Sequence, residues 1–216
     1  MYITPSSHIF EWKSQKELVD YEDALQWMDT RVKALQRGEG SECAWFLEHP
    51  SLYTIGSSGQ ENDILNLQKY PFYKTGRGGQ VTYHGPGQRV VYLMLDLNTR
   101  YHDIRRYVRE LEEWIIRTLV TFGVKGERRE GRVGIWVQKE GHDHKIAALG
   151  IRVQKWVTSH GIALNVNPDL QAYGDIIPCG LKDYGVTSLT DLGINVTLEE
   201  VDEVLQKTFP FIVFHG

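Results

Sequence analysis

Apolar residues recur at helical spacing in three separate segments of the chain. The first segment begins at Asp20, a good helix N-cap, and runs to about Arg37. The second begins near Asp103 and stops at Gly123, and its apolar residues form one stripe. The third opens at Thr197 with the capping box Thr-Leu-Glu-Glu. The pattern therefore predicts three amphipathic helices.

Strand-like apolar runs lie between these helices. The runs 43–49 and 89–97 are almost continuously apolar, which is typical of strands covered on both faces. Three further runs predict strands, at 134–138, 145–153 and 155–166. The last two are joined by a very short link at Gln154-Lys155, which favours an antiparallel hairpin. The stretch 139–144 is polar and predicts an exposed loop.

The order of these elements indicates the fold class. Several strands follow one another, and helices do not alternate strictly with them. This favours an α+β fold with a mixed or antiparallel sheet and flanking helices over a doubly wound parallel sheet. A chain of 216 residues can bury a proper core, and residues 1–216 are expected to form a single domain.

Composition excludes some classes of function. The chain is 41% hydrophobic and 24% charged, with a formal net charge of −4, so no global field attracts nucleic acid or acidic membranes. Apolar runs are too short to span a bilayer, and Met1–Thr4 begins no signal peptide. Two cysteines cannot build a disulfide scaffold. A cytoplasmic location is expected, with reduced thiols favoured over a Cys43–Cys179 disulfide.

A glycine-rich stretch occupies residues 75–88, with the sequence TGRGGQVTYHGPGQ. It lacks the spacing of a phosphate-binding loop and leads into a strand-like run rather than a helix. One interpretation is a hairpin with a turn at each end. The other is a ligand-binding loop, because Arg77 can supply several donors and His84 a ring nitrogen.

Histidines and one lysine raise further hypotheses. The pair His142 and His144 lacks additional ligands and is expected to lie in a solvated loop rather than a metal site. His160 lies inside an apolar strand and is expected to be a core histidine, although the adjacent Gly161 is compatible with a ligand wall. Lys145 opens the apolar run KIAALGI, so its side chain either points into a pocket or reaches water at the strand end.

The two cysteines have different surroundings. Cys43 lies inside the apolar run CAWFL and fits a buried, inert thiol. Cys179 lies between Pro178 and Gly180, a turn-like setting that more often carries chemistry. As a nucleophile it must ionise, and a nearby cation would favour the thiolate. Contact between Lys145 and Cys179 is a hypothesis at this point.

Several motifs together resemble one enzyme family. The segments RGGQVTYHGPGQ (77–88), KIAALGIRVQKWVTSHGIALNV (145–166), IIPCGL (176–181) and GVTSL (185–189) are similar to those of lipoyl(octanoyl) transferases. LEHPSLYTIG (47–56) resembles the N-terminal signature of the same family. The resemblance covers roughly residues 20 to 190.

This resemblance implies a fold similar to the biotin and lipoate protein ligase catalytic domain. It implies that Cys179 carries the acyl group as a thioester and that Lys145 lowers the thiol pKa and shuttles protons. The acyl site would be lined by Arg77, Gly78, Gly79, Gln80, Val81, Thr82, Tyr83, His84, Ala148, Leu149, Gly150, Gly161, Ile162 and Ala163. Tyr173 departs from the family pattern, which more usually has phenylalanine there, and this change could alter the pocket wall.

The resemblance also implies the substrates. The donor would be octanoyl-acyl carrier protein, and the acceptors lipoyl domains of 2-oxoacid dehydrogenase E2 subunits and the glycine cleavage H protein. Neither a cofactor nor a metal is expected, and neither nucleic acid nor membrane is an expected partner. The alternatives are an ATP-dependent lipoate or biotin-type ligase, a cysteine hydrolase and a non-catalytic acyl-binding protein.

Basic residues near these motifs raise one last hypothesis. Because both protein partners of the family tend to be acidic, a local basic rim would attract them despite the negative total charge. The alternative is a set of scattered, solvated charges. The residues concerned are Lys74, Arg77, Arg89, Arg152, Lys155 and Lys182.

Overall fold

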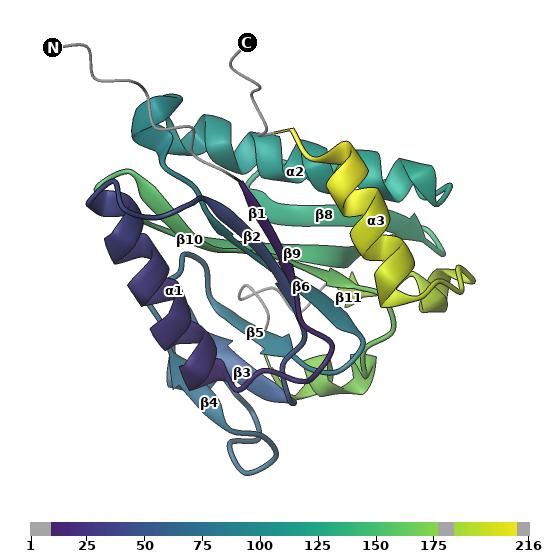
Figure 1. Cartoon of the computed structure of the whole chain (residues 1–216). Helices are drawn as coiled ribbons and strands as arrows, with labels where there is room; N and C mark the ends of the chain where they lie inside the picture. The colour runs from purple at the N-terminus through teal and green to yellow at the C-terminus, as the bar shows by residue number, and fades with distance from the viewer. Residues whose placement is uncertain (1–9, 177–183, 211–216) are drawn as a thin grey trace, which may run out of the picture.

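The computed structural model describes residues 10–176 and 184–210, and its centre is a large mixed sheet (Figure 1). Within these residues eight strands form the sheet, in the order β1-β2-β6-β10-β9-β8-β7, with β11 paired to β9. The strands are β1 (Glu11–Ser14), β2 (Cys43–Leu47), β6 (Gln88–Met94), β7 (Glu127–Arg129), β8 (Arg132–Lys139), β9 (His142–Gln154), β10 (Val157–Asn165) and β11 (Gly185–Val186).

A second sheet has three strands in the described part of the chain. Its order is β4-β3-β5, formed by Phe72–Lys74, Leu52–Ile55 and Val81–His84 respectively. Short 3₁₀ helices connect the elements: η1 (Glu61–Asp63), η2 (Leu97–Thr99), η3 (Leu170–Asp175) and η5 (Thr190–Leu192). The small sheet lies beside α1, below the large sheet in Figure 1.

The three predicted helices are confirmed nearly to the residue. They are α1 (Tyr21–Gln36), α2 (Ile104–Thr121) and α3 (Leu198–Thr208). Asp20 caps α1 by accepting from Glu22 N, and Asp103 caps α2 by accepting from Arg106 N. Thr197 forms the expected capping box of α3.

These helices cover opposite faces of the large sheet. The helices α2 and α3 pack with Val91 and Leu93 of β6 in one cluster, whereas α1 packs with Val90 and Tyr92 of the same strand in another. Every residue of β2 and β6 is buried, because successive side chains point to opposite faces and both faces are covered. This agrees with the near-continuous apolar runs of the sequence.

One sequence prediction about the connections is wrong, and one of two open interpretations is ruled out. Residues 139–144 do not form an exposed loop, since β8 reaches Lys139 and β9 starts at His142, leaving a two-residue turn. Asp143 belongs to β9 and pairs with Arg129 and Arg132, which explains its place in a sheet. For the glycine-rich stretch 75–88, the structure rules out the hairpin interpretation, because β5 pairs with β3 in the small sheet whereas β6 belongs to the large one.

The hairpin predicted at Gln154-Lys155 is confirmed. Strands β9 and β10 pair antiparallel from Val157↔Gln154 to Leu164↔Ala147. The turn residues Lys155 and Trp156 have φ of 48° and 63°, the positive values that a tight two-residue hairpin turn requires. This long pair forms the floor of the site described below.

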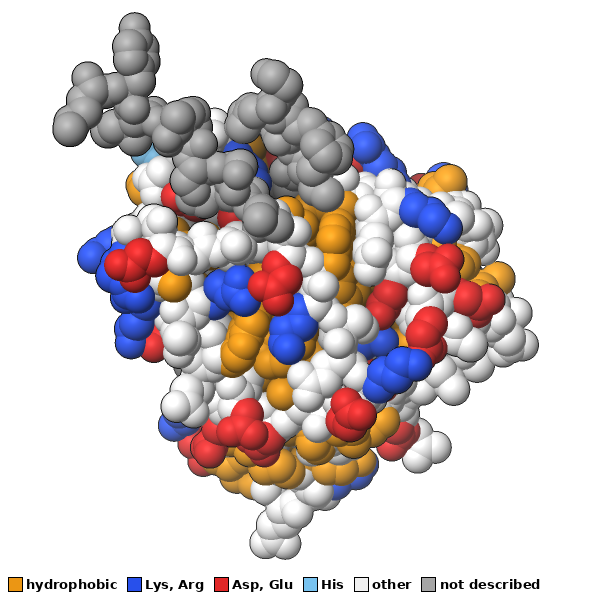
Figure 2. Space-filling view, in the orientation of Figure 1, with side chains coloured by type: hydrophobic (Ala, Val, Ile, Leu, Met, Phe, Trp, Pro, Cys, Tyr) orange, Lys and Arg blue, Asp and Glu red, His pale blue; other side chains and the backbone are white. Residues whose placement is uncertain are grey.

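Charges of both signs are interspersed on the face that carries α1 and β1 (Figure 2). This mixture matches a net charge of −4 spread over 24 basic and 28 acidic residues. Across the described residues, none of the helices combines the length and the apolar character that crossing a bilayer requires.

Candidate active site

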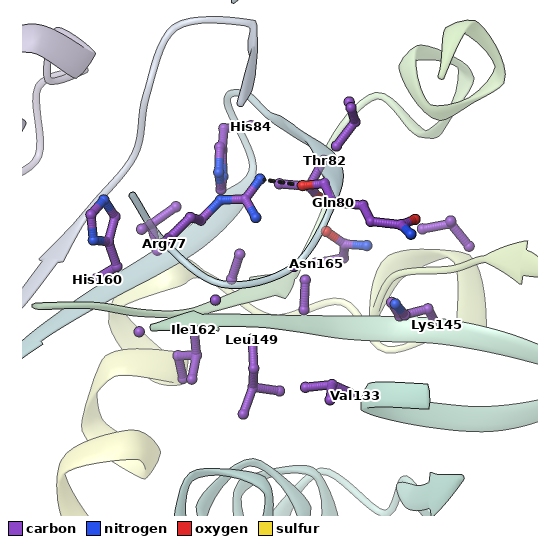
Figure 3. A pocket seen from close by; sticks show the side chains of 18 of the residues that line it. Arg77, Gln80, Thr82, His84, Val133, Lys145, Leu149, His160, Ile162 and Asn165 are labelled. Atoms are coloured by element: carbon purple, nitrogen blue, oxygen red, sulfur yellow. Dashed lines mark hydrogen bonds between the residues drawn. The ribbon is translucent and has the colours of Figure 1, made fainter. Parts of the chain in front are cut away.

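A cavity of about 270 Å³ lies between the β9–β10 pair and the loop of residues 75–80 (Figure 3). Its lining includes His160, Gly161, Ile162, Ala163 and Asn165 of β10. At about 3.3 Å per residue, these five steps along the strand correspond to roughly 16 Å. The cavity is therefore elongated along the strand pair.

Two glycines allow close backbone approaches around the cavity, Gly150 under the roof residue Arg77 and Gly161 beside the neighbouring strand β6. A Cβ on Gly150 would lie 2.8 Å from Arg77 Cδ, and a Cβ on Gly161 would lie 2.3 Å from the Val91 carbonyl oxygen. Both distances are below any real Cβ contact, so a larger residue would displace its neighbours. Glycine at these positions therefore keeps the cavity shape.

Arg77 holds the roof of the cavity together. Its Nη2 donates to the Thr54 carbonyl at 2.7 Å and to the Gln80 carbonyl at 2.9 Å, and its Nη1 donates to the Gly78 carbonyl at 3.0 Å. The side chain is buried. The fork of donors expected from the sequence is thus directed at the protein's own backbone, although Arg77 also lines the cavity.

His84 is a buried, neutral histidine at the cavity wall. Its Nδ1 lies 2.7 Å from Gln88 Oε1, and its Nε2 lies 3.3 Å from Thr54 Oγ1. Burial lowers its pKa well below 6.5, and the nearby His49 ring and Arg77 charge act in the same direction. It is positioned as a hydrogen-bonded wall residue.

Asn165 joins four elements beside the cavity. Its Oδ1 accepts from Gln88 Nε2 at 3.0 Å and from the Tyr173 hydroxyl at 3.1 Å. Its Nδ2 donates to the Thr187 carbonyl at 3.0 Å. The Tyr173 hydroxyl also accepts from Gln88 Nε2 at 2.8 Å. This polar cluster therefore links β6 and β10 to η3 and to the residue that follows β11.

Lys145 lies at the open end of the cavity, where Val133 is 55% exposed. Its Nζ is 4.8 Å from the centre of the Trp136 ring, a cation–π contact. The sequence left two alternatives for this side chain, a pocket or water at the strand end. In the structure Lys145 lines the pocket and stays partly exposed. Lys145 also pairs with Val186, so β11 runs alongside it.

His160 lies at the buried end of the same cavity. Its Nε2 is 3.3 Å from Thr75 Oγ1, and its ring packs edge-on to Tyr92 at 5.7 Å between centroids. Burial lowers its pKa to about 3, with the Arg77 and Arg152 charges acting in the same direction. His160 is thus both buried, as expected, and part of a cavity wall.

Most of the predicted site residues come together at this cavity. Those that line it are Arg77, Gly79, Gln80, Val81, Thr82, His84, Lys145, Ala148, Leu149, Gly150, Gly161, Ile162 and Ala163. Two others have different surroundings. The Gly78 N–H donates to the Ile151 carbonyl, and Tyr83 packs among Tyr53, Tyr70 and Tyr173 with its hydroxyl 2.9 Å from Ser51 Oγ. Cys179 lies outside the described residues.

The other chemical candidates are largely structural. Cys43 is a buried free thiol whose pKa is raised to about 12, chiefly by desolvation. Of the proposed basic rim, Arg77 is buried and Arg89 forms a buried ion pair with Asp202 at 2.8 Å. Lys182 lies outside the described residues. In the part of the chain that the structure describes, no three His, Cys, Asp or Glu residues are arranged to hold a metal ion.

Several cavity residues were not predicted from the sequence. Val90 and Tyr92 line it from β6, Asn165 from β10, and Arg132, Val133 and Trp136 from β8. Asn165 carried a usable signal, a polar residue within the apolar run IALNV. The β8 residues carried none, because their place at the cavity depends on how β8 pairs with β9.

Comparison with known proteins places this site in context. The family model of the lipoyl protein ligase A/B catalytic domain matches residues 20–210. The chain is 55% identical over 201 residues to an octanoyltransferase from Paramagnetospirillum magneticum, covering 93% of this chain and 95% of the relative. It is 54% identical over 207 residues to an octanoyltransferase from Nitrobacter hamburgensis, covering 93% and 86%.

Among solved structures, a bi-partite lipoate protein ligase from Thermoplasma acidophilum is similar in fold. The TM-score is 0.69 at 17% sequence identity, with 93% of this chain and 83% of that chain covered. At this identity the likeness concerns the fold alone. It confirms the predicted α+β class with a mixed sheet and flanking helices.

Proposed function

Because this chain belongs to the lipoyl protein ligase A/B catalytic domain family, we propose that it carries octanoyl groups to lipoyl domains. The motifs resemble those of lipoyl(octanoyl) transferases. Octanoyltransferases that match this chain over nearly its whole length confirm that resemblance. The protein is an acyltransferase of lipoate synthesis. The acyl donor is octanoyl-acyl carrier protein. The enzyme acts in the cytoplasm. Its acceptors are lipoyl domains of 2-oxoacid dehydrogenase E2 subunits and the glycine cleavage H protein.

One observation supports octanoyl transfer most strongly. Lys145 lies at the end of an elongated cavity whose wall consists largely of apolar and glycine residues. An alkyl chain gains about 0.8 kcal/mol for each CH₂ that it buries, so an eight-carbon tail contributes roughly 5 kcal/mol. The cavity thus suits a fatty chain whose reactive end meets an ammonium group.

Cys179 is the proposed nucleophile, and its chain neighbours support that role. Tyr173 lines the cavity on one side of residues 177–183, and Val186 pairs with Lys145 on the other side. The described residues that flank this segment therefore both lie at the cavity. An ammonium group close to a thiol lowers the thiol pKa, because it stabilises the thiolate.

In the first step the Cys179 thiolate attacks the carbonyl carbon of the octanoyl thioester. A new C–S bond forms, the C–S bond to the carrier breaks, and the Lys145 ammonium gives a proton to the departing carrier thiolate. The exchange of one thioester for another is close to neutral in free energy. Lys145 is left uncharged beside an octanoyl-enzyme.

In the second step the amine of a lipoyl-domain lysine attacks this enzyme thioester. The C–N bond of the amide forms, the C–S bond to Cys179 breaks, and Lys145 takes the proton that the amine releases. The thiolate and ammonium are thereby restored. Thioester to amide conversion runs downhill, so the reaction needs no nucleotide.

Incubation with octanoyl-acyl carrier protein and a lipoyl domain, without ATP, tests this function. The wild type and a Cys43→Ala variant should octanoylate the domain, whereas Cys179→Ala should lose the activity, as measured by intact mass spectrometry. Modification that requires free octanoate and ATP and survives Cys179→Ser would instead establish a ligase. Release of octanoate without an acceptor would establish a hydrolase.

A further inference from the structure

The backbone of His160 has an unusual conformation within β10. Its φ is +59°, a left-handed value that is uncommon for residues other than glycine. The strand pairing with β9 continues through it, with His160 opposite Ile151. Strained backbone inside a regular strand persists only where the surrounding structure imposes it, and it clusters at functional sites.

This conformation places the His160 ring on the cavity side of the sheet. Side chains alternate along a strand, which would set His160 with Thr158 and Ile162. Thr158 lies near Tyr107 of α2, and Ile162, although it also borders the cavity, belongs to the cluster that α2 covers. The His160 ring instead contacts Tyr92 and Thr75, away from α2. The local backbone therefore turns the His160 ring to the face of the sheet that carries Tyr92 and α1, where it lines the cavity.

One nitrogen of this ring lacks a hydrogen bond within the part of the chain that the structure describes. His160 is 4% exposed, and its Nδ1 has no hydrogen-bond partner among the described residues. A buried polar atom without a partner is unfavourable, and native structures rarely retain one without a reason. An alkyl group pressed against Nδ1 would exclude water from it and would offer no hydrogen bond in return.

His160 also lies at the far end of the cavity from Lys145 (Figure 3). It pairs with Ile151, which follows Lys145 by six residues on β9. Six residues of strand separate the two backbone positions by about 20 Å. The space between the side chains is shorter, because Lys145 extends toward Gly134, where a Cβ would lie 3.2 Å from Lys145 Cε, and the His160 ring extends from the other end. A chain whose reactive end lies beside Lys145 thus extends toward the His160 ring.

We propose that His160 forms the end wall of the acyl site and limits the length of acyl chain that the enzyme accepts. The ring excludes longer tails by its volume, and its unpartnered Nδ1 makes contact with a further methylene unfavourable. This inference rests on the proposed octanoyl transfer, and it assigns a residue to the chain-length preference that the transfer requires.

Two variants test this end wall. His160→Gly removes the ring and suits the positive φ, whereas His160→Asn shortens the side chain, keeps a polar tip and also tolerates that φ. The control is Val133→Ala, which removes volume at the open end of the cavity instead. The measurement is kcat/KM for octanoyl, decanoyl and dodecanoyl thioesters of acyl carrier protein, with thermal unfolding of each variant alongside.

His160→Gly should raise the decanoyl-to-octanoyl ratio of kcat/KM by about tenfold, as expected for two further buried methylenes. His160→Asn should raise it less, and Val133→Ala should leave it unchanged. Unaltered ratios in folded His160→Gly or His160→Asn that still transfer octanoate would overturn the end-wall role. Absence of octanoyl transfer by the wild type would instead contradict the proposed function itself.

Discussion

Lys145 reaches the cavity because of the strand that carries it. It is the fourth residue of β9, and its ammonium lies over the Trp136 ring from the neighbouring strand β8. The aromatic face favours a cation at this place. A side chain held in this way can present a positive charge to a thiol without leaving the wall of the cavity.

Removal of this charge should change the reactivity of Cys179, the proposed nucleophile. Lys145→Met should raise the pKa of Cys179, since loss of a nearby cation shifts a thiol by about one unit or more. Alkylation by iodoacetamide near pH 7 should then be about tenfold slower, as measured by the rate against pH. The control Lys125→Met removes an exposed lysine that pairs with Glu127 on the surface. Equal rates in both variants would remove Lys145 from this role.

At the level of elements, the strands and 3₁₀ segments around the cavity are joined by few polar contacts. The Asn165 side chain bonds to Gln88 of β6, Tyr173 of η3 and Thr187 after β11. The hydroxyl of Tyr173 takes part in this cluster, where it accepts from Gln88 Nε2 and donates to Asn165 Oδ1. The cluster fixes the described residues on both sides of the segment that contains Cys179.

Replacement of this amide should therefore destabilise the protein. Asn165→Leu keeps a similar volume but leaves Gln88, Tyr173 and Thr187 each without one partner, which should cost about 1–3 kcal/mol per unsatisfied group. Chemical unfolding measures the loss. Asn62→Leu, at an exposed position, is the control and should stay within about 0.5 kcal/mol of the wild type. A similar effect in both would contradict the role of the cluster.

Local signals allowed the helices to be predicted, whereas the sheet connections depended on distant residues. Asp20 and Thr197 act within one turn of the chain, so their caps are visible in the sequence. The polar sequence around Asp143 predicts a loop, because its partners Arg129 and Arg132 are brought to it only by the pairing of β7, β8 and β9. His160 likewise gave no sign that its ring would leave the α2 face.

On the scale of the whole molecule, three neutral histidines are buried around the cavity. Burial lowers the pKa of His49 to about 4 and of His160 to about 3, from an ordinary 6.5, and it lowers that of His84 as well. Each ring is thus protonated in the unfolded chain at a pH where it stays neutral in the folded protein. The stability that they contribute is present above about pH 6.5 and is lost as the pH falls.

The free energy of unfolding should therefore decrease between about pH 6.5 and pH 4. Each histidine contributes about 1.4 kcal/mol per pH unit over its range, or about 4 kcal/mol per unit for three. Urea unfolding at a series of pH values measures this slope. His84→Gln should reduce this slope by about 1.4 kcal/mol per pH unit, the contribution of one proton. His142→Gln, at an exposed position, should not reduce it. Equal slopes in the wild type and His84→Gln would contradict the burial of a neutral His84.

The cavity itself is a property of the assembled molecule. The motifs identified most of its lining, because the family resemblance covered the glycine-rich stretch and both strands of the floor. Val133 and Trp136 were missed, since only the pairing of β8 with β9 brings them to the open end. The positions of Lys145 and His160 at opposite ends of the cavity could likewise be known only from the folded structure.

The most direct test of the central claim is the position of the acyl group on the enzyme. The wild type is incubated with octanoyl-acyl carrier protein without an acceptor, digested under mildly acidic conditions, and examined by peptide mass spectrometry. An octanoyl thioester on Cys179, absent from Lys145→Met at early times, is the predicted result. Octanoylation of Cys43 instead, whose pKa is raised to about 12 by burial, or no covalent octanoyl-enzyme at all, would contradict it.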